Sequence, residues 1–447
     1  MKIVARMFVV VLLLAVGASA CGDTGGETTQ GTGAPAAADE GPIDYTAIGL
    51  WDDGPCDPAK PPLKIGLMTV FESGVISLGD QADSLEVSAT AFNARGGANG
   101  SCIEVHTCDD KANLDQSLAC VREIDEAGVV ATVNDQGTVG QAEVSAAMGQ
   151  AGIPRLASLP TPQDWADQNT YPLDAGGTGV AFLLPQALIE IGVTNIGVIR
   201  VDFAQASALK GFLESIYGDE GVTFPVDVAV PPGTTDYSQF LLAAENGGAD
   251  GAVLALGEQE AVQVMRAGEQ LGSGVKLGAS LGSFPHATIS DIGDFAGEMA
   301  FAGTYPPATV DLPVYKALRA DFAASGKAAL QPVNVEASPM RSWIGLYALL
   351  WMIRDSKMTT FTREGITAML DSAEDVPMLD MYGGENWTPA FNHEGVFKRA
   401  GMNTWVTWKW DPDAPAPGGL TGNFVQVATI DFDEVLCGSP IGGPPPC

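Results

Sequence analysis

Short apolar segments typical of strands alternate with amphipathic segments typical of helices along most of this chain, and this alternation restricts the fold most strongly. One series starts with the strand-like run 63–70, which is followed by a helical segment, 82–97, that ends on two glycines. A second series of similar length starts near residue 174. Such an alternation predicts parallel sheets covered by helices on both faces. We therefore expect an α/β protein with two doubly wound parallel-sheet lobes.

The last part of the chain does not continue this alternation. From Trp387 through Trp405, Trp408 and Phe424, the sequence predicts irregular structure with short strands. Two lobes imply a cleft, and ligands of open α/β sheets bind beyond the carboxyl ends of the strands.

The N-terminus carries an export signal. Lys2 and Arg6 precede an apolar run, 7–16, and three small residues then lead directly to Cys21. This arrangement resembles the lipobox of bacterial lipoproteins, which predicts a signal peptide over 1–20 and a lipid-anchored Cys21. Because Ala18 stands where leucine is usual, an ordinary secretory peptide followed by a chance cysteine is the alternative. Both readings predict an extracytoplasmic protein, and the lipobox reading also predicts anchoring to the bacterial cell membrane through Cys21.

A polar segment follows Cys21, and the overall charge is strongly acidic. Residues 22–42 contain no large apolar side chain, so we expect a disordered tether over 21–47. The apolar run Ile344–Ile353 is too short to span a membrane and predicts a core helix. The formal net charge of −33 argues against nucleic acid as a partner, because phosphate binding needs a basic surface.

Six of the seven cysteines remain once Cys21 is assigned to lipid, and an even number in an exported chain favours disulfides. The expected pairs are Cys56–Cys102, Cys108–Cys120 and Cys437–Cys447. A zinc site that includes His106 is the alternative, but the chain has no CxxC pair. We therefore predict neither a metal nor a cofactor.

Several segments, taken in their order and spacing, resemble one family. They are KIGLMTV, AFNARGGANG, CDDKANLDQSLACVREI, GIPRLASLPTP, NIGVIRVD and GADGAVLAL. Between about residues 63 and 397 the chain resembles the type I periplasmic-binding-protein superfamily. The closer likeness is to the branched-chain amino acid (Leu/Ile/Val) group of substrate-binding proteins for ABC transporters.

The resemblance implies two lobes joined by three crossover segments, near 173–175, 303–306 and 387–391. The implied first lobe comprises 60–174 and 305–386, the second comprises 175–304 and 387–436, and a Pro/Gly tail follows at 437–447. A solute bound between the lobes favours a closed state. The membrane subunits of an ABC permease would recognise that state, and the binding protein would act as a monomer.

Two loops of the first lobe are candidate ligand contacts. In the loop 134–141, glycines and a following helix N-terminus can hold a carboxylate, and Thr138 adds a hydroxyl. The resemblance implies the same role for this loop, whereas the alternative is a turn in which Thr138 only caps the helix. In the loop 157–161, the resemblance assigns ligand contacts to Ser158 and Thr161, against the alternative of a proline-held turn.

The second lobe departs from the amino acid binders. Asp202 is followed by Phe203 without the family's tyrosine, and Leu281 stands where the resemblance expects a glutamate for the ligand's ammonium. Either Asp202 or Glu258 replaces that glutamate, or the ligand has no α-amino group, which we favour. Glu258 can instead be a solvated residue in the first turn of a helix. The candidate solutes are therefore amino acids, amides and small carboxylates.

Aromatic residues at strand ends or crossovers can form the walls of the cleft, although core packing is their commoner role. Phe71, Phe203, Phe284 and Tyr305 are in such places, and we expect about half of them to be walls. The complete set of candidate ligand-binding residues is Phe71, Gln136, Gly137, Thr138, Ser158, Thr161, Asp202, Phe203, Glu258, Ser283 and Phe284.

One motif favours an enzyme. Residues 278–282 match the GxSxG of serine hydrolases around Ser280, with Asp311, Asp380 and His393 downstream. A nucleophile elbow needs a helix directly after the serine, and Pro285 with polar neighbours stands there instead. We therefore predict a solute-binding protein that is not an enzyme. A ligand-sensing receptor subunit of the same fold is another alternative.

Overall fold

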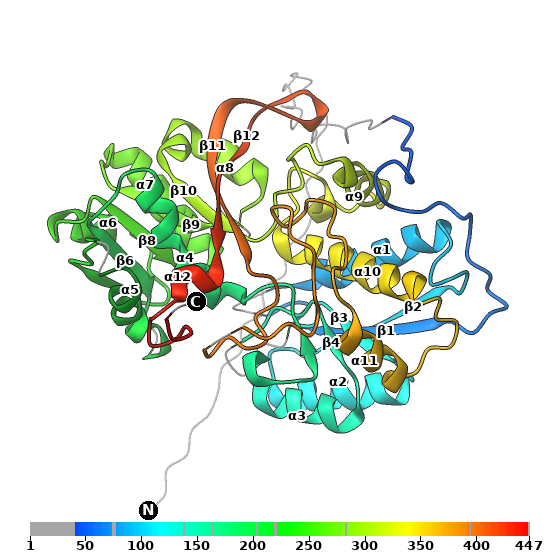
Figure 1. Ribbon diagram of the computed structural model, residues 1–447. Helices are drawn as coiled ribbons and strands as arrows, with labels where there is room; N and C mark the ends of the chain where they lie inside the picture. Colours follow the sequence, from blue (N-terminus) through cyan, green and yellow to red (C-terminus); the bar gives the residue numbers. More distant parts are fainter. Residues whose placement is uncertain are drawn as a thin grey trace, which may run out of the picture. The chain divides into compact units, whose positions relative to one another are not determined.

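The computed structural model describes residues 41–73, 77–136, 139–161, 164–202, 204–218, 221–281, 284–393 and 395–445 (Figure 1). The first sheet is wholly parallel, with strand order β2-β1-β3-β4-β5. Its strands are β1 (Leu63–Thr69), β2 (Ile103–Asp109), β3 (Ala131–Val133), β4 (Arg155–Leu156) and β5 (Thr170–Tyr171).

Helices cover both faces of this sheet because both faces of β1 are apolar. Leu63, Ile65 and Leu67 belong to one buried cluster, and Met68 belongs to another. The larger cluster packs the sheet against α1 (Gly79–Ala94), α9 (Pro313–Ala324), α10 (Ala337–Asp355) and α11 (Arg363–Ser372). The smaller packs it against α2 (Leu114–Glu126) and α3 (Gln141–Ala151). As predicted, Ile344–Ile353 lies in a buried helix, α10.

The second sheet repeats this order and then adds an antiparallel ribbon. Its order is β12-β11-β10-β9-β8-β6-β7, in which β6 to β10 are parallel. These strands are β6 (Ile196–Val201), β7 (Asp227–Val230), β8 (Gly251–Ala255), β9 (Lys276–Ser280) and β10 (Ala300–Gly303). The prediction of two doubly wound parallel-sheet lobes is therefore confirmed.

Two buried clusters also sandwich the second sheet. One lies against α4 (Gly176–Glu190), α5 (Leu209–Tyr217) and the short α12 (Phe432–Leu436). The other lies against α6 (Ser238–Asn246), α7 (Glu258–Leu271) and α8 (His286–Ile292). None of the helices that the described residues form is both long and apolar enough to cross a membrane.

The expectation of irregular structure after Trp387 is wrong for β11 (Thr404–Ala416) and β12 (Leu420–Asp431), which form a long antiparallel ribbon. β11 contains two prolines, Pro412 and Pro415, and proline normally interrupts a strand. The ribbon tolerates them because its pairing shifts register between Asp411 and Pro415. Nearer the sheet, Trp405 and Val406 pack into opposite clusters, so this part of β11 is covered on both faces.

The chain passes between the lobes' cores three times. Leu173 packs in the first lobe and Ala175 in the second, and after β10 the chain returns with Tyr305 in the first core. On the third passage the chain alternates between the two cores, because Phe397 packs in the second core and Met402, later in the chain, packs in the first. The lobe boundaries proposed from the sequence stay a prediction.

Two of the predicted disulfides are present, Cys56–Cys102 and Cys108–Cys120. Cys437 is also disulfide-bonded, whereas its predicted partner Cys447 and the predicted lipid anchor Cys21 lie outside the described residues. The described part of the chain contains no group of three His, Cys, Asp or Glu side chains arranged to hold a metal ion. His106 instead contacts Glu123.

Candidate functional site

A cavity of about 150 Å³ lies where the carboxyl ends of strands from both sheets meet the crossover segments. Leu159 follows β4, and Asp174 follows β5. Ser280 ends β9, and Thr304 follows β10. This is the location expected for a ligand of open α/β sheets.

A buried ion pair forms the polar wall of this cavity. Asp174 is 2% exposed, and its Oδ2 accepts hydrogen bonds from Arg341 Nη2 at 2.6 Å and Thr304 Oγ1 at 3.0 Å. Its Oδ1 accepts one from the Gly176 amide at 2.9 Å. Burial opposes the charge of Arg341, but the Asp174 carboxylate outweighs this effect and raises the pKa of the guanidinium above its usual value. The guanidinium of Arg341 therefore keeps its charge at neutral pH.

Arg341 retains hydrogen-bonding capacity for a ligand. Its side chain begins on the first turns of α10 and is 5% exposed, and Nη1 is buried without a hydrogen-bond partner among the described residues. The guanidinium also lies 5.5 Å from the centre of the Tyr305 ring, and Tyr305 lines the cavity as one of the predicted walls. A buried cationic N–H without an acceptor is costly, so the site suits a ligand with a carboxylate or another strong acceptor.

A second buried network holds the two predicted loops of the first lobe in place. Arg155, 1% exposed, donates from Nε to Asp135 Oδ2 at 2.7 Å and also pairs with Asp164. Asp164 Oδ2 accepts from the amide and the hydroxyl of Thr161, both at 2.8 Å. Burial alone would raise the pKa of Asp164, but the charge of Arg155 lowers it below its usual value. The Thr161 hydroxyl thus serves the loop's own structure.

Two further predicted contacts in these loops, Gln136 and Ser158, have different surroundings. Gln136 Oε1 accepts from Gln81 Nε2, and Gln81 Oε1 accepts from Thr69 Oγ1, each at 2.9 Å. The hydroxyl of Ser158 is buried without a hydrogen-bond partner in the described residues. Ser158 directly precedes Leu159, which lines the cavity. Gly137 and Thr138 lie outside the described residues.

Three carboxyl groups converge from both lobes. Glu258 is the first residue of α7 in the second lobe. In the first lobe, Glu336 directly precedes α10, and Asp80 lies in the first turn of α1. Burial and the negative charges of Glu258 and Asp80 raise the pKa of Glu336 to about 8. Burial also raises the pKa of Glu258, and a hydrogen bond with Glu336 opposes this effect. Glu336 therefore holds its proton more tightly than an ordinary glutamate, and it shares a hydrogen bond with Glu258.

The remaining predicted contacts are scattered. Asp202 is exposed, and Phe71 packs partly against the first core. Phe284 is 4% exposed in the second core, with its ring 6.5 Å from that of Phe301, so it packs as core rather than as a cleft wall. Phe203 and Ser283 lie outside the described residues.

The residues proposed for a serine hydrolase do not share a site. Ser280 lines the cavity, but Asp311 and Asp380 line a different one. Both ring nitrogens of His393 are occupied, Nδ1 with Asp433 Oδ1 at 2.9 Å and Nε2 with the Gly401 carbonyl at 2.8 Å.

Comparisons with known proteins agree with this architecture. Residues 62–417 match the family described as "Periplasmic binding protein", whereas no curated protein matches the sequence.

Among similar solved structures, the fatty acid ABC transporter substrate-binding protein from Thermomonospora curvata has a TM-score of 0.68 and 16% identity, covering 88% of this chain and 98% of that one. An ABC transporter solute-binding protein from R. palustris in complex with 4-hydroxybenzoate has a TM-score of 0.66 and 15% identity, with coverages of 83% and 97%. The leucine-, isoleucine-, valine-, threonine- and alanine-binding protein from Brucella ovis, in a closed conformation, has a TM-score of 0.65 and 13% identity, covering 86% of this chain and 98% of that one. At these identities the likeness establishes the fold alone.

Proposed function

This chain belongs to the periplasmic binding protein family, and from this premise we propose that it captures a small polar solute between its lobes and delivers it to the membrane subunits of an ABC importer. The observation that carries the proposal is Arg341, which lines the cavity at the crossover segments and whose buried Nη1 has no hydrogen-bond partner among the described residues. We further propose an extracytoplasmic monomer that is anchored through a lipid on Cys21.

The same observation indicates the ligand's chemistry. A carboxylate would accept from Arg341 Nη1 and complete the hydrogen bonding of the buried guanidinium. Fatty acids and 4-hydroxybenzoate, named for two of the similar structures, are both carboxylic acids. If the ligand also carries an ammonium, the Glu258–Glu336 pair is the acidic group available to it, so amino acids remain candidates beside simple carboxylates.

A thermal-shift screen tests this proposal. Carboxylates such as 4-hydroxybenzoate, octanoate and leucine would be compared with their amides, which lack the carboxylate charge. A ligand at a hundred times its dissociation constant should add about 2.7 kcal/mol of stability. We expect a carboxylate to stabilise the protein and its matched amide to do so less. Stabilisation by the amide that equals that of the acid would contradict the role of Arg341.

The carboxyl cluster predicts a pH dependence of stability. Because the pKa of Glu336 is about 8 in the folded protein and ordinary in the unfolded chain, the folded state holds an extra proton between these values. Stability should therefore fall as pH rises from about 4.5 to about 8, by up to about 1 kcal/mol per pH unit, and this contribution should be constant above that range.

Urea unfolding of Glu336→Gln and wild type across this pH range measures the effect. The variant should lack this part of the slope, so its advantage over wild type grows as pH rises. Glu86→Gln, at an exposed position on α1, is the matched control and should follow wild type. Parallel profiles for wild type and Glu336→Gln would show that Glu336 keeps an ordinary pKa.

We also propose that the protein performs no covalent chemistry. The residues of the possible triad are in separate places, and both His393 nitrogens are engaged, so Ser280 lacks a general base. A fluorophosphonate probe should therefore leave the protein unlabelled. Labelling that disappears in Ser280→Ala would refute this part of the proposal.

A further inference from the structure

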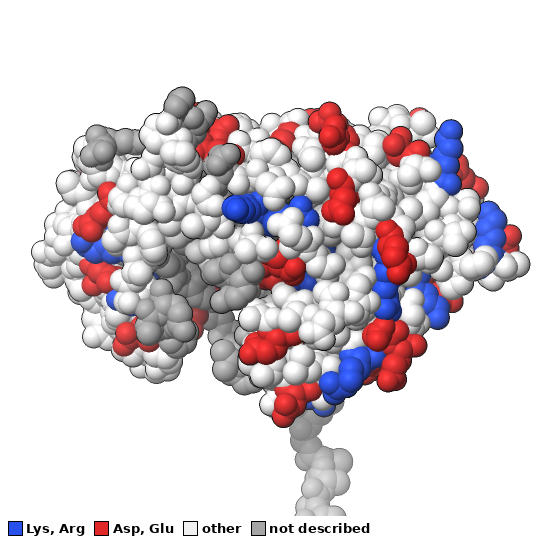
Figure 2. Space-filling view, turned by 60° about the horizontal axis from the view of Figure 1, so that its bottom comes forward, with Lys and Arg blue, Asp and Glu red and all other residues white. Residues whose placement is uncertain are grey.

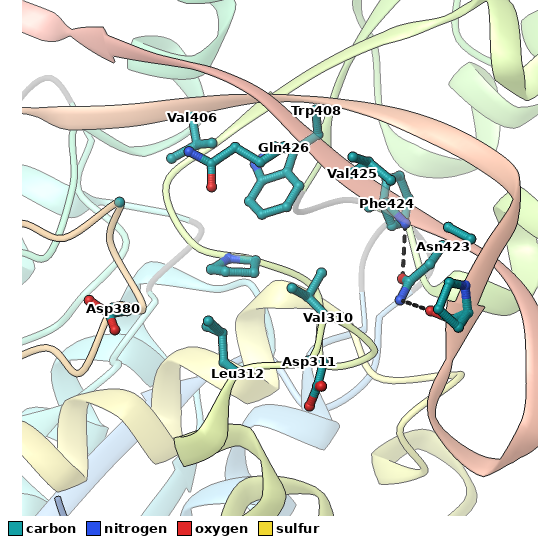
Figure 3. Close-up of a pocket in the computed structure, with 14 residues that line it drawn as sticks. Val310, Asp311, Leu312, Asp380, Val406, Trp408, Asn423, Phe424, Val425 and Gln426 are labelled. Carbon is teal, nitrogen blue, oxygen red and sulfur yellow. Dashed lines mark hydrogen bonds between the residues drawn. The ribbon is translucent and has the colours of Figure 1, made fainter. Parts of the chain in front are cut away.

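A second cavity, of about 350 Å³, lies between the β11–β12 ribbon, the segment 306–312 and the turn 380–383 (Figure 3). It shares no lining residue with the cavity at the crossover segments. Its volume is within the range of small-molecule sites, about 300 to 1,000 Å³. Nothing in the proposed function uses this cavity.

The cavity has a fixed frame. Asn423, 5% exposed on β12, donates from Nδ2 to the Thr309 carbonyl at 2.8 Å and to the Pro415 carbonyl at 3.0 Å. Its Oδ1 accepts from Thr309 Oγ1 at 3.0 Å and from the Phe424 amide at 2.9 Å. The two hydrogen bonds with Thr309 tie the segment 306–312 to the ribbon, and the other two, with Pro415 and Phe424, are within the ribbon. The two walls therefore keep their separation.

Most of the described residues that line the cavity are apolar, and the polar side chains among them are Asn423, Gln426 and the exposed Asp311 and Asp380. Figure 3 shows Trp408 and Gln426 from the ribbon facing Val310 and Leu312 across the cavity. Trp408 is 3% exposed, and its Nε1 has no hydrogen-bond partner among the described residues. Trp408 lines the cavity, and its buried N–H lacks an acceptor among the described residues, so a ligand that reaches this group would gain by supplying one. The amide of Gln426 offers a second polar contact from the same strand pair.

The charges around the cavity exclude an anion. Among the described residues that line it, none is Lys, Arg or His, whereas Asp311 and Asp380 stand exposed at its rim. The carboxylate of Asp311 points away from the cavity in Figure 3. The chain's net charge of −33 adds to this repulsion of anions. The cavity at Arg341 has the opposite preference.

We propose that this second cavity binds an uncharged small molecule that has a flat apolar body and a hydrogen-bond acceptor for Trp408 Nε1. The body would lie between the indole of Trp408 and the side chains of Val310 and Leu312. The proposal goes beyond solute capture at Arg341 and does not depend on it.

Indole N–H signals in a ¹⁵N–¹H NMR spectrum of the folded protein provide the test, with benzamide and benzoate as probes that share one ring. Benzamide at millimolar concentration should move the Trp408 signal saturably, and benzoate should leave it in place. Trp408→Phe assigns the signal. Four other tryptophans have a buried Nε1 without a partner in the described residues and serve as internal references: Trp51, Trp165, Trp387 and Trp405.

Two variants separate binding from indirect effects. Val310→Phe fills the cavity and should abolish the benzamide shift while the reference signals keep their positions. Gln426→Ala provides a second test in case Val310→Phe does not fold. Gln426 is exposed, so its replacement should leave the fold unchanged and weaken benzamide binding by about fivefold. An unmoved Trp408 signal, an equal response to benzoate, or a shift that both variants retain would overturn the proposal. Benzoate that binds at Arg341 would not move Trp408, so the two sites are tested separately.

Discussion

Replacing Arg155 with methionine is expected to cost about 3 to 5 kcal/mol of folding stability. The guanidinium is 1% exposed and neutralises Asp135 and Asp164, which are both fully buried. Methionine fills similar space but leaves two carboxylates without a counter-charge in an environment that disfavours them. Urea unfolding at neutral pH should show a lower midpoint with an unchanged slope.

The matched control for this variant is Arg266→Met. Arg266 also pairs with an aspartate, Asp291, but the two side chains are 41% and 66% exposed. Such a pair contributes at most about 1 kcal/mol, so this variant should unfold close to wild type. Equal losses for the two variants would mean that burial of the Arg155 network is not what stabilises the loops after β3 and β4.

Replacing Arg341 with methionine is expected to weaken binding of the best carboxylate found in the screen by about a hundredfold, and to cost about 3 to 5 kcal/mol of stability. The binding loss follows from removal of the buried donor Nη1, and the stability loss follows from the unpaired Asp174. Calorimetric titration gives the affinity, and urea unfolding gives the stability.

The double variant Arg341→Met/Asp174→Asn separates these two effects. It removes both charges, so much of the lost stability should return, because no buried carboxylate remains unpaired. Affinity for the carboxylate should not return, since the donor is still missing. Restored affinity in the double variant would show that the ligand does not contact Arg341.

The alternation of strands and helices was sufficient to predict both sheets, because inner parallel strands such as β1 and β6 are buried on both faces and read as apolar runs. The same reasoning failed for β11 and β12. Trp405, Trp408 and Trp410 are residues that favour a strand, but Pro412 and Pro415 follow in the same strand, and the register shift near them explains how the ribbon accommodates both prolines.

The site was harder to predict than the fold. The loops after β3 and β4 could be selected from their glycines and hydroxyls, but Arg341 and Asp174 are 167 positions apart and meet only through the folded topology. One signal was present: Arg341 is a charged residue within the apolar segment that forms α10. A buried arginine requires an acidic partner or a ligand, and this requirement identifies Arg341 as a candidate site residue. Phe284 was predicted as a cleft wall because it follows a strand, but side chains at strand ends can also pack in the core, as Phe284 does.

Acidic and basic side chains are interspersed on one face of the molecule, with no continuous basic surface among the described residues drawn there (Figure 2). This distribution, together with the net charge, agrees with the exclusion of nucleic acid as a partner.

The ribbon has a consequence for the integrity of the whole protein. β11 pairs with β10, whose other neighbour is β9, so it shields the backbone amides and carbonyls of β10 from other chains. A protease cut before residue 404 would uncover that row of hydrogen-bonding groups beside freshly exposed tryptophan-lined surface. Uncovered strand margins of this kind recruit one another and aggregate. The C-terminal ribbon thus protects this member of the periplasmic binding protein family from association through the edge of β10.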